Sequence, residues 1–124
     1  MGQSYRDLIA WQKAMSFVME VYRTTRAFPR DEVFGLASQT RRMAVAIPSN
    51  IAEGQARHTT REFIQFISHG EGSLAELDTQ LTISSELDYC QGPMTALAVS
   101  ISERAKELRR MLNSLRRRLE GMDR

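Results

Sequence analysis

The sequence predicts an all-α protein, an antiparallel four-helix bundle with up-down-up-down connectivity. Apolar residues recur at alternating steps of three and four in four separate segments, which is the pattern of amphipathic helices. The breaks between these segments are short and contain Pro or Gly, so consecutive helices should run antiparallel. No β-hairpin pattern occurs. Because 124 residues are too few for two comfortable domains, we interpret residues 1–124 as one domain.

The first helix is expected between Ser4, a plausible N-cap with Asp7 three residues later, and Phe28-Pro29, which ends it. The first helix has a second apolar edge, formed by Ile9, Phe17 and Val21. The third helix adds two further apolar residues outside its core stripe, Ile64 and Phe66. This extra apolar surface either widens the core or forms a subunit interface. The predicted core stripe of the first helix consists of Leu8, Trp11, Met15, Val18 and Tyr22.

The second helix is expected from near Gly35 to Gly54, with Gly54 as its C-cap. Pro48 removes the amide that would donate to Ala44, so we predict one helix with a bend. Asn50 lies near the core stripe, and its amide is a candidate partner for the groups that Pro48 leaves free. The predicted stripe is Leu36, Thr40, Met43, Ile47 and Ile51, or Asn50 in place of Ile51. Arg41, Arg42 and Glu53 are expected to contact Glu76 and Asp78 of the third helix.

The third helix begins at a capping box, Thr59-Thr60-Arg61-Glu62, directly before an apolar run. Gly70, Gly72 and Ser73 interrupt its bulky side chains. Because glycine weakens a helix, we expect a neighbouring helix to approach closely there. The predicted stripe is Phe63, Ile67, Gly70, Leu74, Leu77, Leu81 and Ser84.

The fourth helix follows the break Tyr89-Cys90-Gln91-Gly92-Pro93, in which Pro93 suits a first helical turn. Its predicted stripe is the longest in the chain: Leu97, Ile101, Ala105, Leu108, Leu112, Leu115 and Leu119.

Charge divides the chain into three parts. Residues 1–61 carry nine Arg or Lys against five Asp or Glu, residues 62–100 carry six acidic residues and no basic one, and residues 101–124 carry eight basic against four acidic. An acidic third helix between basic flanks suits helices that pair by charge as well as by apolar contact. The same charge distribution leaves a basic C-terminal segment that could bind an acidic partner.

The sequence contains no recognisable catalytic, metal or cofactor site. A di-iron bundle needs Glu-x-x-His pairs, whereas Gln55 and Phe66 stand three residues before His58 and His69. Cys90 has no basic neighbour to lower its pKa, so we interpret it as a buried or half-buried thiol. We therefore expect no enzymatic activity, no cofactor, no metal and no small-molecule substrate.

A cytoplasmic location without membrane contact is also expected. A single cysteine cannot form an intramolecular disulfide, and no uncharged apolar run is long enough to span a bilayer. The first residues lack the basic-then-apolar order of a signal peptide.

A basic stripe on the fourth helix is the candidate nucleic-acid-binding site, because clustered cations bind phosphates by releasing counterions. The same arginines also complement the dipole of a helix C-terminus, and Glu103 and Glu107 can pair with residues three positions later. From the residues alone, a solvated or intersubunit charged face carries more weight than a nucleic-acid site. The candidate residues are Lys106, Arg109, Arg110, Arg116 and Arg117, with Arg118 thickening the end of the stripe.

The run from Gln39 to Gly54, which includes Ile47-Pro48-Ser49-Asn50-Ile51-Ala52-Glu53-Gly54, resembles the signature of the 23S rRNA intervening sequence (S23) family of bacterial four-helix bundle proteins. The similarity covers roughly residues 5–119. One small departure is Ala46, where serine is common in the family. Three further matches are Asp7-Leu8 through Trp11-Gln12-Lys13-Ala14, Phe28-Pro29 followed by Gly35-Leu36, and Gly72-Ser73-Leu74-Ala75-Glu76-Leu77.

This resemblance implies an up-down bundle that assembles as a homopentamer and has no enzymatic activity. Some members are encoded in sequences inserted within large-subunit ribosomal RNA genes, and related bundle proteins are nucleic-acid-binding accessory subunits of retroelement reverse transcriptases. The leading hypothesis is therefore a non-enzymatic oligomer that binds nucleic acid, such as structured RNA, through basic patches. The alternative is a structural scaffold or protein-interaction module with no nucleic-acid role.

Overall fold

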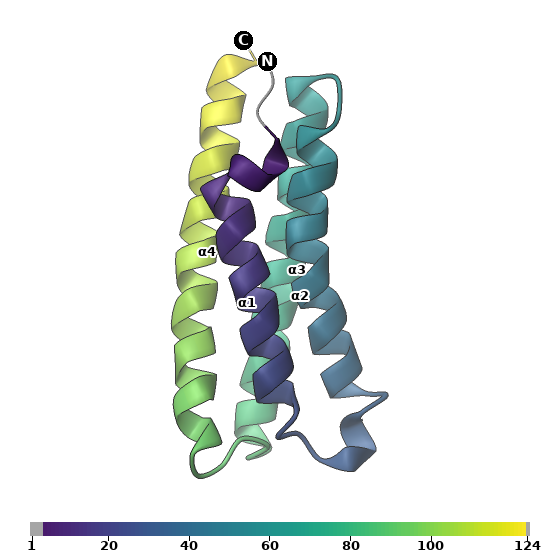
Figure 1. Cartoon of the computed structure of the whole chain (residues 1–124), viewed down its shortest axis with the longest axis vertical. Coiled ribbons are helices and arrows are strands. Elements are labelled where there is room, and N and C mark those ends of the chain that lie inside the picture. Colours follow the sequence, from purple (N-terminus) through teal and green to yellow (C-terminus); the bar gives the residue numbers. More distant parts are fainter. Residues whose placement is uncertain (1–3, 124) are drawn as a thin grey trace.

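The computed structural model describes residues 4–123, most of which belong to four α-helices: α1 (Ile9–Thr25), α2 (Leu36–Gln55), α3 (Thr60–Glu86) and α4 (Met94–Met122). Two short 3₁₀ helices, η1 (Tyr5–Asp7) and η2 (Arg30–Glu32), precede α1 and α2. Consecutive α-helices run in opposite directions, so α1 begins at the end of the bundle where α4 stops (Figure 1). The predicted all-α, antiparallel four-helix bundle is confirmed. The predicted single domain of residues 1–124 includes residues 1–3 and 124, which lie outside the described residues.

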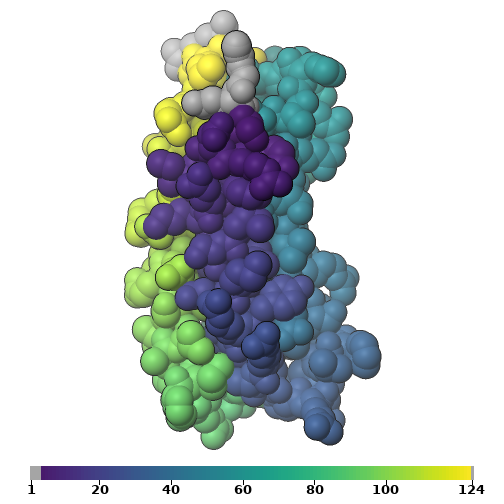
Figure 2. Space-filling model, viewed as in Figure 1, coloured from purple at the N-terminus to yellow at the C-terminus, as the bar shows by residue number. Residues whose placement is uncertain are grey.

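The four helices are arranged as a square. α1 packs against α2 and α4, and α3 packs against the same two helices from the opposite corner. Within residues 4–123, no Cα atoms of a diagonal pair of helices come within 8 Å of each other. On the face shown in Figure 2, α1 lies between α4 and α2 and fills the space between them.

The core consists of one cluster to which all four helices contribute. α3 and α4 confirm the predicted stripes: Ile67, Leu74 and Leu77 are buried, and every stripe residue of α4 from Ile101 onward is buried. The bulkiest fully buried side chains are Phe17, Ile47, Ile51, Ile67, Leu77, Ile101, Leu108 and Leu112.

The predicted stripe of α1 is wrong by about one residue. Of that stripe only Val18 is buried, whereas Tyr22 is 38% exposed and Leu8, Trp11 and Met15 are half-buried. The observed core face contains Ala10 and Ala14. Their small side chains are not recognised in a pattern defined by bulky apolar residues, but they allow close helix packing. Ile9, from the predicted second edge, is 64% exposed, while the other two residues of that edge are in the core. The core face of α1 is Ala10, Ala14, Phe17, Val18 and Val21.

The start of α1 also differs from the prediction. Ser4 caps η1, not the long helix, because its Oγ accepts a hydrogen bond from the Arg6 amide at 3.2 Å. Leu8 then adopts an extended backbone conformation, with ψ 125°, and α1 begins after it. This turn brings the Tyr5 ring 5.3 Å from the Trp11 ring, in an edge-to-face arrangement that favours aromatic pairing.

α2 continues through Pro48, as predicted, but it extends past Gly54 to Gln55. Gly54 is therefore not a C-cap: it is buried, and a Cβ atom there would lie 2.7 Å from Phe66 Cβ. The glycine is needed for the close approach of α3. Asn50 Nδ2 donates to the Ala46 carbonyl at 2.7 Å, so it does not bond the Ala44 carbonyl that Pro48 leaves free.

Arg41 contacts α1 and not the acidic residues of α3, contrary to the prediction. Its Nε donates to Thr25 Oγ1 at 2.7 Å, and its guanidinium lies 4.7 Å from the centre of the Tyr22 ring. Glu53 forms its ion pair with Arg57, one turn along the same helix, at 2.6 Å. The charge asymmetry of the sequence therefore does not determine these contacts, because the orientation of each side chain on its helix selects a different neighbour.

The capping box of α3 is confirmed: Thr59 Oγ1 accepts from the Glu62 amide at 3.1 Å and donates to Glu62 Oε1 at 3.0 Å. The prediction for the glycines of α3 holds only in part. Gly70 is buried, and a Cβ there would make ordinary contacts with Asn50 and Leu112. Gly72 is exposed, with no atom near enough to contact a Cβ. The glycine that a close approach of α2 and α3 requires is therefore Gly54, not Gly70 or Gly72.

Two long-range contacts close the end of the bundle opposite the start of α1. The Tyr89 hydroxyl donates to Glu32 Oε2 at 2.6 Å, and the Tyr89 ring lies 5.5 Å from the Phe28 ring. Cys90, beside Tyr89, is half-buried as expected, and burial raises the pKa of its thiol. Among residues 4–123, no helix is long and apolar enough to cross a membrane.

Candidate nucleic-acid interface

α4 carries its basic residues on the side away from the core. Its buried stripe runs from Ile101 to Leu119, so residues half a turn away from that stripe face solvent. Arg110 and Arg117, seven residues apart, lie on this outer face and are exposed. Arg109, also exposed, lies beside them. The local cause is the regular apolar repeat of α4, which fixes the orientation of every polar position.

The structure separates the five candidate residues into two groups. Arg116 is directed toward α3: its Nε donates to Glu71 Oε1 at 2.7 Å, and its Nη1 lies 3.1 Å from Glu120. These contacts raise the pKa of Arg116, and the hydrogen bond to Glu71 is the largest cause. Its charge is neutralised within the chain. Arg116 is therefore separated from the other candidates.

Lys106 makes a looser contact. Its Nζ lies 3.8 Å from Glu103, as expected for residues three apart on a helix, and both side chains are more than half exposed. An exposed pair of this kind contributes little and is easily exchanged for another partner. The expected pairing of Glu107 with Arg110 does not occur. Glu107 instead lies 3.8 Å from Lys13 of α1.

Four arginines of α4 remain without an acidic partner among the described residues, and we call them the basic face: Arg109, Arg110, Arg117 and Arg118. The first three line one shallow groove with Asn113 and Ser114, with a volume of about 400 Å³. Amide and hydroxyl side chains between cations are suited to bonding phosphate and sugar oxygens. The groove therefore combines charge with hydrogen-bonding groups.

A second groove adjoins the basic face, and the sequence gives no signal for it. It has a volume of about 600 Å³ and lies between the start of α1 and the second half of α4. Arg110 and Arg118 line it together with two acidic residues, Asp7 and Glu107, and with apolar residues that include Ile9 and Met111. Because residues 100 positions apart form it, only the packing of α1 on α4 reveals it. Because two carboxylates balance its two arginines, the groove offers mainly its apolar surface, which suits an unstacked base.

A metal ion is the other ligand to consider for the described part of the chain. Among residues 4–123, no three His, Cys, Asp or Glu side chains are grouped so that they could hold a metal ion. His69 packs edge-to-face against Phe66, with ring centres 5.8 Å apart.

Comparison with known families decides where this chain belongs. The sequence model of the 23S rRNA-intervening sequence protein family matches residues 6–114. The chain belongs to this family. Among curated proteins, none matches the chain. The matched region of this 23S rRNA-intervening sequence protein contains the first three α-helices and most of α4, including Arg109 and Arg110 of the basic face. Arg117 and Arg118 follow the matched region.

Proposed function

We propose that this protein binds nucleic acid, with structured RNA as its ligand, through the basic face of α4. The supporting observation is that Arg109, Arg110 and Arg117 share a groove with Asn113 and Ser114 and have no acidic partner among the described residues. Four unpaired guanidinium groups on one surface favour a polyanion, because each phosphate contact releases counterions. The family name, which refers to 23S rRNA, supports RNA as the first probe.

The protein acts as a binding protein without an enzymatic activity, in the cytoplasm. RNA contacts along α4 involve phosphate and sugar, so recognition depends on shape more than on base sequence. The groove beside Arg110 and Arg118 adds a place for an unpaired base against Ile9 and Met111.

Self-association would place several copies of the basic face in one particle. We therefore propose that the protein forms a homopentamer. An apolar groove of about 290 Å³ between α1 and α2 supports it as the contact between copies. Trp11 and Met15 line the groove from α1, and Val45, Pro48 and Ala52 line it from the signature segment of α2. Val45 is 41% exposed. A second copy seated here buries apolar surface that the isolated chain leaves in water.

The RNA-binding test uses fluorescence anisotropy with a labelled, structured RNA at several salt concentrations. The wild-type protein should bind with an affinity that falls steeply as salt rises. Arg110→Glu combined with Arg117→Glu should weaken binding by about 100-fold or more, since two phosphate contacts are replaced by repulsion. The matched control is Arg23→Glu with Arg26→Glu, the same change of charge at two exposed arginines near the end of α1. No salt-sensitive binding at micromolar protein, or equal losses in both double variants, would overturn the proposal.

Self-association is measured separately by light scattering after size exclusion. Val45→Arg should reduce the mass to that of a single chain, because it places a charge in the apolar groove. Arg110→Glu with Arg117→Glu should leave the mass unchanged. If that double variant changes the mass, its arginines act between subunits, and the scaffold alternative replaces the RNA-binding proposal.

A further inference from the structure

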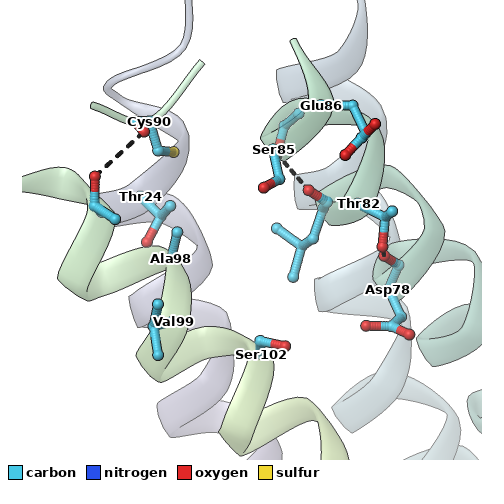
Figure 3. Close-up of a pocket in the computed structure, with 12 residues that line it drawn as sticks. Thr24, Asp78, Thr82, Ser85, Glu86, Cys90, Ala98, Val99 and Ser102 are labelled. Carbon is cyan, nitrogen blue, oxygen red and sulfur yellow. Dashed lines mark hydrogen bonds between the residues drawn. The ribbon is translucent and has the colours of Figure 1, made fainter. Parts of the chain in front are cut away.

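A separate cavity of about 300 Å³ lies between α3 and α4, near the end of α3 and the start of α4. In Figure 3, residues of α3 such as Asp78 and Ser85 lie on one side of the space and Ala98, Val99 and Ser102 of α4 lie on the other. Thr24 of α1 and Cys90 of the connecting loop also line it. No residue of the basic face takes part.

The charged groups of this cavity are all acidic. Asp78 and Glu86 line it, and neither side chain has a cationic partner within residues 4–123. Because residues 62–100 contain no Lys or Arg, the part of α3 that lines the cavity supplies no positive charge to balance them. The remaining polar groups are mostly hydroxyls, which accept hydrogen bonds readily from an ammonium group. The cavity is therefore suited to a cation.

Thr24 provides an independent indication of a ligand. It is 0% exposed, and its Oγ1 has no hydrogen-bond partner in the part of the chain that the structure describes. A buried hydroxyl without a partner is costly, and most such groups in proteins are bonded. Thr24 lines the cavity, so a donor bound there can satisfy this oxygen.

The shape of the cavity selects the kind of cation. Leu81, Ala98 and Val99 form apolar walls, which suit the methylene groups of an aliphatic chain. Asp78 and Glu86 are eight residues apart on one helix, which corresponds to about 12 Å along its axis. This spacing is comparable to the length of an extended linear polyamine. Among the described residues, no group of three His, Cys, Asp or Glu side chains that could hold a metal ion is found.

We propose that this cavity binds a linear aliphatic polyamine. One ammonium group pairs with Asp78, a second pairs with Glu86, and the methylene chain between them lies against Leu81 and Val99. An amine N–H at the inner wall donates to Thr24 Oγ1. The site shares no residue with the basic face, although Asp78 also borders a small neighbouring pocket that Lys106 and Arg109 line.

The test is a calorimetric titration of the full chain with spermidine, without RNA and at constant ionic strength. Saturable binding is expected, with no binding of an uncharged diol of the same length. Asp78→Asn and Glu86→Gln should each weaken binding by about tenfold, the usual effect of removing one charge-assisted hydrogen bond. The control Glu76→Gln removes the same charge from an exposed position of α3 that does not line the cavity.

A second variant tests the cavity without altering its carboxylates. Val99 is 58% exposed, so Val99→Lys should leave the fold intact while its ammonium group occupies the site and abolishes spermidine binding. Circular dichroism checks that each variant remains folded. Three results would each overturn the proposal: no saturable binding by the wild type, equal weakening by Glu76→Gln and Asp78→Asn, or unchanged binding by folded Val99→Lys.

Discussion

Arg116 of α4 donates a 2.7 Å hydrogen bond to Glu71 of α3, and both side chains are about three-quarters buried. This ion pair joins the two helices with the most opposite charge, and it removes one arginine from the basic stripe of α4. The arginines of the basic face have no such partner among the described residues, although Arg109 borders α3 in a small pocket that Ala75 and Asp78 also line.

The Arg116–Glu71 pair should stabilise the fold and contribute little to RNA binding. We expect a double-mutant cycle with Arg116→Gln and Glu71→Gln to give a coupling free energy of about 1 kcal/mol, as for a partly buried charged pair. Urea unfolding of the four proteins measures this coupling. In the RNA-binding assay Arg116→Gln should weaken binding less than Arg110→Gln, and the reverse order would contradict the assignment of the basic face.

The Tyr89–Glu32 hydrogen bond should make stability depend on pH. This bond lowers the pKa of Glu32 below its ordinary 4.5 and raises the pKa of Tyr89 above 10.0. A lowered carboxyl pKa stabilises the fold above pH 4.5, and this contribution is lost as the pH falls through the folded pKa. A raised phenol pKa stabilises the fold below pH 10.0, and this contribution is lost as the pH rises through the folded value.

Tyr89→Phe should therefore be less stable than the wild type between about pH 5 and pH 9, and the difference should shrink toward both extremes. Melting temperatures of the two proteins across this range measure the effect. Tyr22→Phe is a suitable control, since that exposed hydroxyl has no hydrogen-bond partner among the described residues. If the difference in melting temperature between the two proteins stays constant with pH, the Tyr89 hydroxyl does not lower the pKa of Glu32.

Gly54 and Gly72 should respond oppositely to alanine. A Cβ at Gly54 would lie 2.7 Å from Phe66 Cβ and 2.9 Å from Phe63 Cδ1, so α3 must shift, and we expect a loss of about 1–3 kcal/mol. At exposed Gly72 no neighbour obstructs the new methyl group, so alanine should stabilise the helix by up to about 1 kcal/mol. Denaturant unfolding of both variants tests the pair, and stabilisation by Gly54→Ala would contradict the packing described.

Arg41→Lys should weaken the contact between α1 and α2. Lysine lacks the planar guanidinium that donates from Nε to Thr25 Oγ1 at 2.7 Å while lying over the Tyr22 ring. We expect a loss of about 1 kcal/mol in the free energy of unfolding. Arg42→Lys is the matched control because Arg42 is exposed and has no partner among the described residues, and it should change stability by less than about 0.5 kcal/mol.

Four features of the fold could be predicted from the sequence alone: the helical class, the antiparallel order, the capping box at Thr59 and the buried faces of α3 and α4. Each of these follows from a local signal: a regular apolar repeat, a short break between helices, or a side chain three residues from its backbone partner. The sequence also located the basic residues on the outer side of α4, since the core stripe fixes the rotation of that helix.

Which of those basic residues have no acidic partner depends on how the helices pack against one another. The pairing of Arg116 with Glu71, the contact of Arg41 with Thr25 and the role of Gly54 all depend on the distance and rotation between neighbouring helices. The rotation of α1 was missed because Ala10 and Ala14 add little to an apolar pattern but allow close packing. Both the groove beside Arg110 and the acidic cavity at Thr24 arise between helices, so no single stretch of sequence encodes them.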